Sequence, residues 1–139
     1  MSDTSSTQHT ATAITGKVPF KTHIETDGTF NQVTDTPESM GGSNLGASPT
    51  ALVSAALASC KSITAKMYAD RKGWPVDAIR VDVEHIKRDG KDVFETLVTI
   101  DGDGLDDEQR KRIYEITAKC PVHNLIVGET TVSSTLSDE

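Results

Sequence analysis

The sequence predicts an α/β protein of the α+β type, built from antiparallel hairpins and two main helices. Short segments of alternating apolar and polar residues, bounded by Gly, Pro and Asp, are typical of half-buried strands. Two pairs of such segments are joined by Asp-Gly, the dipeptide that favours a tight hairpin turn. Two longer segments carry apolar residues at helical spacing, which predicts two amphipathic helices.

The length of 139 residues fits a single domain, which we expect over residues 13–139. Residues 1–12 are rich in Ser and Thr and poor in apolar residues, so a disordered or loosely ordered tail is expected there. Two strands are expected next, over residues 20–26 and 29–34, with an Asp-Gly turn between them.

The longest helix is expected over residues 49–72. Ser48 is a favourable N-cap, Pro49 suits the first helical position, and Gly73 supplies a C-terminal stop. The first half of this helix is apolar almost all round, which predicts burial on most sides. Charged residues are expected to bring the second half toward water: Lys61, Lys66, Asp70 and Arg71.

The remainder of the chain predicts a hairpin, a helix and a final strand. Apolar and charged residues alternate over residues 79–84, and a second strand is expected over residues 93–100. A helix is expected over residues 105–119, with acidic residues in its first turn, where the helix dipole favours them. Pro121 disfavours helical backbone at the residue before it, so this helix should end there. A last strand is expected over residues 130–136.

The charge and the N-terminus exclude several classes of partner. The formal charge is −7, from 14 Lys and Arg against 21 Asp and Glu. This sign repels phosphate backbones and anionic lipids, so we expect no nucleic acid and no membrane as partners. We find no secretory signal and no apolar run long enough to span a membrane, and therefore expect a cytoplasmic protein. The low apolar fraction of 35% favours an oligomer.

Each of the two cysteines lies on the apolar face of an expected helix. Cys60 shares its face with four apolar residues, so that it should point into the protein: Leu52, Ala56, Ile63 and Met67. Cys120 follows Ile113 and Ile116 at helical spacing. Because such helices pack through their apolar faces, the two sulfurs can meet, and a disulfide requires their Cα atoms to lie within about 7 Å.

The pattern alone leaves three other interpretations open. Free cysteines often do no more than fill a core. A structural disulfide would stabilise the fold by closing a long loop, although a reducing cytoplasm disfavours it. Cys120 and His123 have a C-x-x-H spacing that would suit zinc with Cys60 as a third ligand, but the other histidines are scattered. We expect no bound metal and no cofactor.

The residues around both cysteines resemble those of a known family. The glycine-rich segment 41–49 leads into an Ala- and Leu-rich helical segment ending at Cys60, and the segment 67–75 follows it. Residues 119–123 read Lys-Cys-Pro-Val-His. These segments resemble the two cysteine motifs of the OsmC/Ohr-like family (osmotically inducible protein C-like). The order of elements over residues 14–136 is also similar.

The resemblance implies an intertwined homodimer, in which antiparallel sheets wrap two central helices and the active sites lie at the subunit interface. It also implies reduction of organic hydroperoxides or hydrogen peroxide, with electrons from a dithiol reductant such as a lipoyl group or another thiol. In that reaction Cys60 attacks the peroxide as a thiolate and becomes a sulfenic acid. Cys120 then closes a disulfide with it.

The sequence departs from the family at the groups that activate the thiolate. The better-characterised peroxidases of the family usually carry a glutamate one or two positions after the proline that begins the helix, but Thr50 and Ala51 stand there. No arginine precedes Arg71, although the family also uses an early arginine. In place of an arginine, the early strands offer lysine and histidine as cationic or potentially cationic groups: Lys17, Lys21 and His23.

We therefore expect a divergent branch, whose thiolate is activated by a lysine, by a histidine, or hardly at all. His123 is the candidate auxiliary residue because it lies within one helical turn of Cys120. Glu38 and Asp35 are acids that could orient a cation. The alternative to an enzyme is a non-enzymatic OsmC-fold protein, which binds a small apolar ligand or senses oxidants stoichiometrically.

Overall fold

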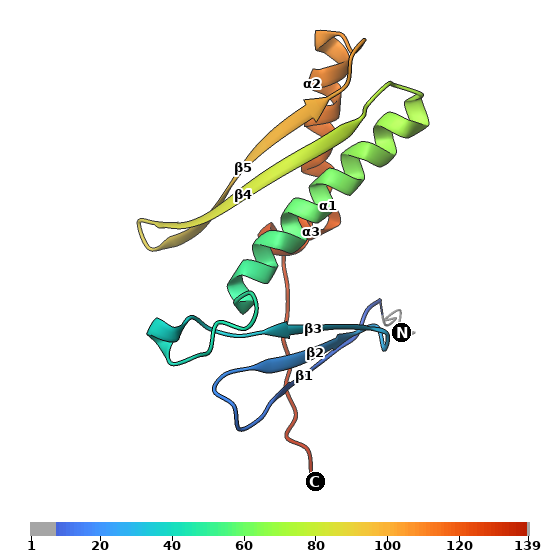
Figure 1. Ribbon diagram of the computed structural model, residues 1–139. Helices are drawn as coiled ribbons and strands as arrows, with labels where there is room; N and C mark the ends of the chain where they lie inside the picture. The colour runs from blue at the N-terminus through green and yellow to red at the C-terminus, as the bar shows by residue number, and fades with distance from the viewer. Residues whose placement is uncertain (1–7, 139) are drawn as a thin grey trace. The chain divides into compact units, whose positions relative to one another are not determined.

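The computed structural model describes residues 8–138, and the chain divides into two compact units, Met1–Leu52 and Val53–Glu139 (Figure 1). Each unit contains one antiparallel sheet, and helices accompany the sheets, which confirms the α+β class. The single domain expected over residues 13–139 stays a prediction. Within the described residues, none of the helices combines the length and the apolar character that crossing a bilayer would require.

A three-stranded sheet forms the first unit, in the order β1 (Ala11–Thr15), β2 (Thr22–Thr26) and β3 (Phe30–Thr34). Strands β2 and β3 form the expected hairpin. Its turn holds Asp27 and Gly28 at φ angles of 53° and 69°. This left-handed backbone is accessible to glycine and tolerated by Asp, which is why Asp-Gly is favoured at such turns.

Strand β1 was not predicted from the sequence. It begins at Ala11, so its first two residues lie within the tail expected over residues 1–12. All five side chains of the strand are exposed, so no buried face marks it in the sequence. It forms because its backbone pairs antiparallel with β2, which satisfies the donors and acceptors along the strand. Residues 1–7 of the expected tail lie outside the described residues.

The carboxylate of Asp35 organises the loop after β3. Asp35 is 1% exposed. Its oxygens accept hydrogen bonds of 2.7–3.3 Å from four backbone N–H groups: those of Phe20, Thr36, Ser43 and Leu45. Burial alone would raise the pKa of this carboxyl, but the four donors together outweigh burial, so the net shift of the pKa is downward. Asp35 thus binds the loop backbone, and none of the ion pairs among residues 8–138 includes it.

The glycine-rich part of this loop packs tightly against backbone. A Cβ at Gly46 would meet the carbonyl oxygen of Val33, and a Cβ at Gly42 would meet the carbonyl oxygen of Thr36. Glycine is therefore required at both positions for close approach of the chain. The short helix η1 (Glu38–Met40) lies in the same loop, and its Glu38 is exposed.

Helix α1 (Pro49–Lys72) has the bounds predicted from the sequence. The hydroxyl of Ser48 caps its N-terminus by accepting a hydrogen bond of 3.2 Å from the N–H of Ala51. Gly73 ends the helix with φ of 70°, a conformation in which glycine carries no steric penalty.

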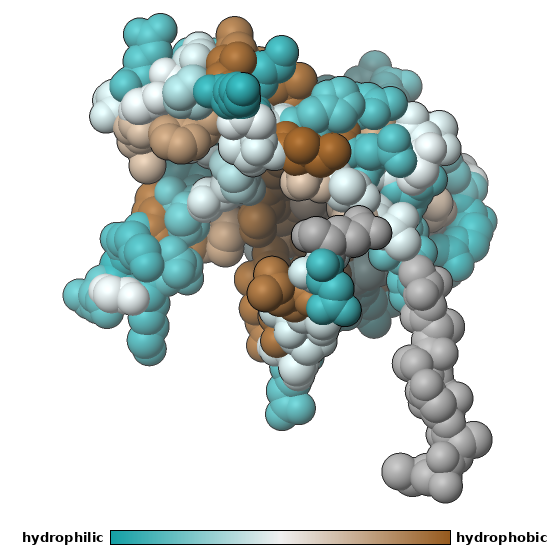
Figure 2. Space-filling model, turned by 90° about the horizontal axis from the view of Figure 1, so that it is seen from below, coloured by the Kyte–Doolittle hydropathy of each residue, from teal (hydrophilic) through white to brown (hydrophobic). Residues whose placement is uncertain are grey.

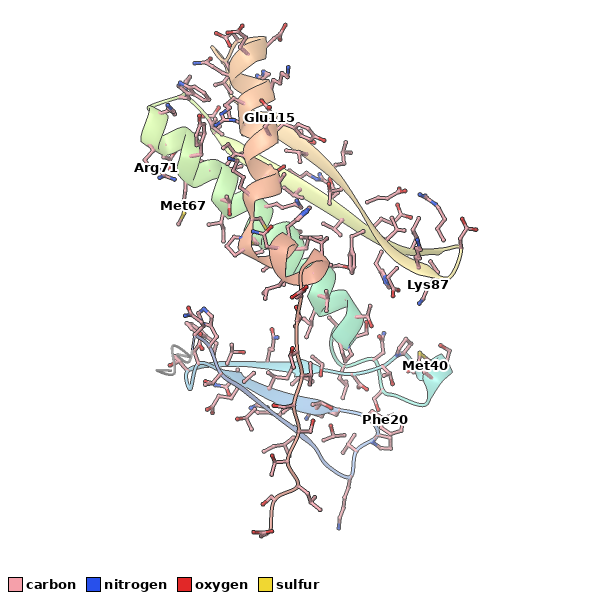
Figure 3. All side chains as sticks on the ribbon, turned by 180° about the vertical axis from the view of Figure 1, so that it is seen from behind. Phe20, Met40, Met67, Arg71, Lys87 and Glu115 are labelled. Atoms are coloured by element: carbon pink, nitrogen blue, oxygen red, sulfur yellow. The ribbon has the colours of Figure 1, made fainter. Side chains whose placement is uncertain are left out.

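The buried face of α1 differs from the expected one. Its buried residues recur at every fourth position: Leu57, Lys61, Ala65 and Ala69. Ile63 and Met67, which were expected to be buried beside Cys60, are 53% and 61% exposed, and Met67 projects outward in Figure 3. The alanines form the covered face because their small side chains allow neighbouring elements to pack close to the helix. Lys61 was expected to face water and is instead 5% exposed.

The second sheet is a long hairpin of β4 (Ala78–Arg88) and β5 (Lys91–Asp101). Asp89 and Gly90 form its turn with φ angles of 52° and 78°, as the Asp-Gly pair predicts. Half-buried and exposed side chains alternate along most of β4. This alternation is the pattern that the sequence predicts for a strand with one covered face.

Three helical segments follow the hairpin: α2 (Asp107–Ile116), η2 (Thr117–Lys119) and α3 (Pro121–Val127). A capping box between Asp106 and Gln109 begins α2. The core of this unit is a small cluster of buried residues: Ala65, Ala69, Val76 and Ile113. Four partly buried hydrophobic residues pack against this cluster: Trp74, Ile79, Ile100 and Leu105.

The prediction of a final strand over residues 130–136 is wrong, because that segment has no regular secondary structure. Val132 and Leu136, the large apolar residues of the expected strand, are 86% and 92% exposed. The segment pairs with no strand among the described residues, so its alternating pattern has no sheet to join. Helix α3 was not expected, although Pro121 at its first position is a favourable start.

Replacing Asp35 with Asn should lower the urea midpoint of unfolding at neutral pH, because an amide offers one acceptor oxygen where a carboxylate offers two. Since the pKa of Asp35 is lowered by folding, its stabilising effect is present above the ordinary carboxyl pKa. It is lost as the pH falls through the lowered value. The midpoints of wild type and Asp35→Asn should therefore converge in strong acid. Exposed Glu38→Gln is the control and should behave as wild type. Equal midpoints for Asp35→Asn and wild type at every pH would contradict this role.

Candidate functional site

The two cysteines come from separate segments of the second unit. Cys60 lies in α1 and is half-buried, whereas Cys120 lies between η2 and α3 and is fully buried; both are free thiols. Cys120 has the extended backbone that Pro121 favours, with φ of −78° and ψ of 133°. Its sulfur caps α3, because Sγ accepts a hydrogen bond of 3.3 Å from the backbone N–H of His123.

The fold brings the two thiols close enough to influence each other. Burial is the main cause that raises the pKa of the Cys120 thiol, and the neighbouring Cys60 thiol raises this pKa further. The backbone N–H of His123 acts in the opposite direction, since it stabilises negative charge on the sulfur. The net shift keeps Cys120 in its protonated, neutral form over a wider pH range than an exposed thiol.

A buried lysine lies beside the cysteines. The Nζ of Lys61 donates a hydrogen bond of 3.0 Å to the carbonyl oxygen of Thr117. It also lies 3.1 Å from Nδ1 of His123. Because an ammonium group has only donors, Nδ1 accepts this second bond and the ring proton of His123 sits on Nε2. His123 therefore joins the two groups, with its ring on Lys61 and its backbone on Cys120.

The burial of Lys61 was not expected from the sequence, because a charged residue on a helix is ordinarily solvated. The signal that could have found it is its spacing, since Lys61 lies four residues after Leu57 and four before Ala65. Residues at this spacing share one helix face, and Leu57 and Ala65 are both buried. A lysine on such a stripe must find polar partners inside the protein.

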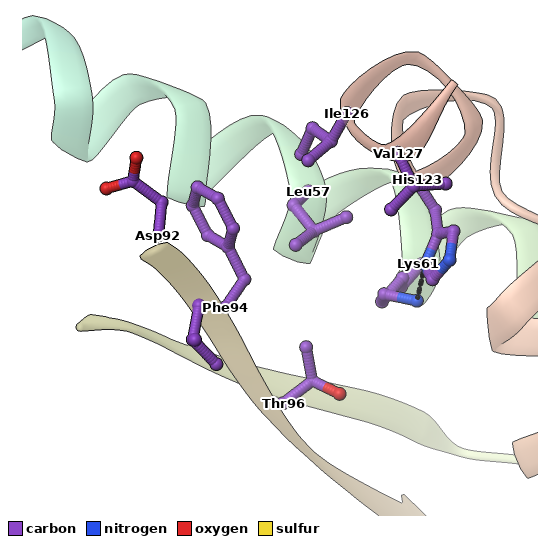
Figure 4. A pocket seen from close by; sticks show the side chains of 9 residues that line it. Leu57, Lys61, Asp92, Phe94, Thr96, His123, Ile126 and Val127 are labelled. Carbon is purple, nitrogen blue, oxygen red and sulfur yellow. Dashed lines mark hydrogen bonds between the residues drawn. The ribbon is translucent and has the colours of Figure 1, made fainter. Parts of the chain in front are cut away.

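A pocket of about 310 Å³ opens beside Lys61 (Figure 4). Residues from α1, β5 and α3 line it: Leu57, Lys61, Asp92, Val93, Phe94, Thr96, His123, Ile126 and Val127. Most of these side chains are apolar, and neither cysteine is among them. The carboxylate of Asp92 is occupied by other partners, at 2.9 Å from His85 and 3.2 Å from Lys87.

The other groups considered from the sequence lie in the first unit or at the start of α1. The ring of His23 is 3.2 Å from the side-chain oxygen of Asn31, across the β2–β3 hairpin. Lys17 and Lys21 are exposed. The first turn of α1, where Thr50 lies, carries no acidic residue.

The side chains of Cys120 and His123, which have the C-x-x-H spacing, are not arranged to hold a zinc ion together. The ring of His123 faces Lys61, and only its backbone N–H reaches the sulfur of Cys120. Over residues 8–138, no group of three or more His, Cys, Asp or Glu side chains is placed where it could hold a metal ion.

Large apolar side chains are exposed on several elements of the second unit. On the face seen in Figure 2, hydrophobic residues lie at the surface among hydrophilic ones. The second unit contributes an exposed apolar set: Val53, Ile63, Met67, Leu97, Leu125 and Val127. Exposed apolar surface of this kind is typical of contact sites with another molecule.

Comparison with known proteins shows where this fold occurs. The family model described as OsmC-like protein matches residues 41–135. An OsmC-like protein from Mycoplasma pneumoniae is 21% identical with a TM-score of 0.72, over 88% of this chain and 89% of that chain. The organic hydroperoxide resistance protein OsmC from Legionella pneumophila is 22% identical with a TM-score of 0.60, over 88% and 90%. The organic hydroperoxide resistance protein OhrB of Bacillus subtilis is 22% identical with a TM-score of 0.59, over 88% and 92%. None of the curated proteins matches this sequence.

The fold and the site define an α+β protein with two free thiols, one in α1 and one between η2 and α3, which are near enough for Cys60 to raise the pKa of Cys120. The family match covers most of the chain and includes both cysteines and His123. The chain belongs to the OsmC-like family. This confirms the family and the fold that the two cysteine motifs predicted.

Iodoacetamide should modify Cys60 of the native, reduced protein severalfold faster than Cys120. The reason is that Cys120 is fully buried and the pKa of its thiol is raised, so it presents little thiolate to the reagent. Mass spectrometry of peptides sampled over time measures both rates. In denaturant, where burial is lost, the two rates should become similar. Faster modification of Cys120 in the native protein would show that the assigned difference in burial is wrong.

Proposed function

We propose that this protein reduces organic hydroperoxides, or hydrogen peroxide, through a redox cycle of Cys60 and Cys120. The observation that carries the proposal is that the half-buried Cys60 thiol is near enough to raise the pKa of the fully buried Cys120 thiol, and that both are free thiols. Cys60 is the more accessible thiol and is assigned the attack on the peroxide. Cys120 is held beside it as a neutral thiol, which suits the second step of the cycle.

In the first step, the thiolate of Cys60 attacks the outer oxygen of the peroxide, so the O–O bond breaks. Cys60 becomes a sulfenic acid, and the alkoxide leaving group takes up a proton and departs as an alcohol. In the second step, the thiol of Cys120 displaces the sulfenic oxygen as water, and the S–S bond forms. An external dithiol then reduces the disulfide and restores both thiols.

The backbone of His123 has a defined place in this cycle. When the reductant attacks the disulfide at Cys60, Cys120 leaves as a thiolate. The N–H of His123, at 3.3 Å from Sγ, stabilises that negative charge. The auxiliary role proposed for His123 therefore belongs to its backbone amide, while its ring binds Lys61.

The relatives and the composition support the remaining parts of the proposal. Two of the similar proteins are named for organic hydroperoxide resistance, which supports the substrate class. A cycle that forms and reduces a disulfide requires a thiol-reducing compartment, so we assign the protein to the cytoplasm. We assign the reductant to the dithiol class, of which a lipoyl group is one member.

A titration with cumene hydroperoxide, followed by mass spectrometry of both cysteines, tests the cycle. In the wild type, one equivalent should produce a Cys60–Cys120 disulfide. In Cys120→Ser the sulfenic acid at Cys60 should accumulate and be trapped by dimedone, because the condensing thiol is absent. In Cys60→Ser, peroxide consumption should fall to the background rate. Ser59→Ala, a substitution of the exposed neighbour, should retain full turnover.

The second candidate function is a non-enzymatic binder or stoichiometric sensor. It is favoured by the first turn of α1, which lacks the carboxylate that family members place there. Many turnovers per chain with dithiothreitol as the reductant would exclude this alternative. One turnover only, or no oxidation of Cys60, would instead exclude the enzyme.

We also propose that the protein is a homodimer, and that the exposed apolar side of α1 contributes to the contact. Ile63 and Met67 are 53% and 61% exposed, and burying large apolar side chains of this kind drives association. Light scattering after size exclusion should give twice the mass of one chain for the wild type. Met67→Glu should shift the mass toward that of one chain. Lys66→Glu, on the adjacent position of the same helix, is the matched control and should leave the wild-type mass. A monomeric wild type would contradict the dimer.

A further inference from the structure

The ammonium group of Lys61 is a buried positive charge without a negative partner. Both of its hydrogen-bond acceptors, the carbonyl of Thr117 and the ring of His123, are neutral. Among the ion pairs of the described residues, none includes Lys61. A buried charge is costly unless an opposite charge compensates it, and an ammonium group has three donors, of which two are used here. The group is therefore poised to bind an anion.

The space available to such an anion is the pocket that Lys61 itself lines. Apolar side chains line most of the rest of this pocket, with Leu57 from α1, Phe94 from β5 and Ile126 from α3 (Figure 4). The only lining carboxylate, that of Asp92, is already paired with His85 and Lys87. The volume of about 310 Å³ is at the lower end of the range for small-molecule sites, roughly 300–1,000 Å³.

These features together point to one ligand chemistry. We propose that the pocket beside Lys61 binds a small molecule with an apolar body and one carboxylate, and that the carboxylate sits on the ammonium group of Lys61. The apolar walls bury the body of the ligand, and the buried cation selects the charge of its head. This site goes beyond the proposed redox cycle, because neither cysteine lines the pocket and the binding requires no oxidation.

Calorimetric titration of the reduced, full-length protein with three eight-carbon probes tests the inference. Octanoate carries a carboxylate, 1-octanol carries a neutral head, and octylamine carries a positive charge. Octanoate should bind at least about tenfold more tightly than 1-octanol, since a charged hydrogen bond in a buried site is worth this much or more. Octylamine should bind more weakly than either. Equal affinity for octanoate and 1-octanol, or no binding of octanoate, would overturn the proposal.

Lys61→Met should remove the preference for octanoate over 1-octanol, because it keeps the apolar stem and deletes the charge. Lys66→Met is the matched control: Lys66 is on the same helix but pairs with Asp70, and its loss should leave the preference unchanged. If Lys61→Met retains the preference for octanoate, the inference is wrong. Circular dichroism checks that each variant is folded.

A second variant keeps the test decisive if Lys61→Met fails to fold. Val127 lines the pocket but is 69% exposed, so it tolerates a polar substitution. Val127→Glu places a negative charge at the pocket and should weaken octanoate more than 1-octanol; equal weakening would count against the inference. The same titration with Cys60→Ser separates the two proposals. Octanoate binding that survives in Cys60→Ser supports the site even if the redox cycle fails.

Discussion

The arrangement of the site depends on the two hydrogen bonds that the buried ammonium group of Lys61 makes. This group binds the carbonyl of Thr117 at 3.0 Å and the ring of His123 at 3.1 Å, and these two residues stand on either side of Cys120 in the sequence. One side chain of α1 thus ties down the segment that carries the buried cysteine. Since Cys60 is the residue before Lys61, the same contact keeps the two thiols near each other.

The two sulfurs are placed in unequal surroundings, and the inequality suits two different chemical tasks. The Cys120 thiol has a raised pKa, chiefly because it is buried, and it receives one backbone N–H from His123. Cys60 is half-buried and reaches the surface. A thiol that must wait in the neutral form for a sulfenic acid benefits from burial, whereas a thiol that must meet a peroxide needs access.

Much of the fold was predictable because its signals are local. The Asp-Gly turns, the Ser48 cap and the Gly73 stop are short sequence features with direct steric or hydrogen-bonding causes, and α1 has its predicted bounds. Strand β1 was not predictable in this way, because its stability comes from backbone pairing with β2. The strand expected over residues 130–136 had the right alternation but finds no partner strand in the described chain.

The site was predictable to the extent that motifs mark it. Both cysteines and His123 could be named from the sequence, and the fold brings these three residues together. The burial of Lys61 could not be derived from residue type, since lysine is rarely buried. The buried face of α1 also differs from the expected one, because burial does not follow residue hydrophobicity alone. Hydrophobicity favoured Ile63 and Met67, but close packing favoured the smaller Ala65 and Ala69.

Helix α1 presents its residues along separate lengthwise stripes. Leu57, Ala65 and Ala69 face the interior, Ile63 and Met67 face outward, and Cys60 lies between these directions. Adjacent positions on an α-helix differ by about 100° in direction, while positions three or four apart nearly coincide. Data from scanning mutagenesis along this helix should therefore be grouped by angle around its axis. Substitutions at two neighbouring positions in the chain will then report on different surfaces of the helix. Substitutions one full turn apart will report on the same surface.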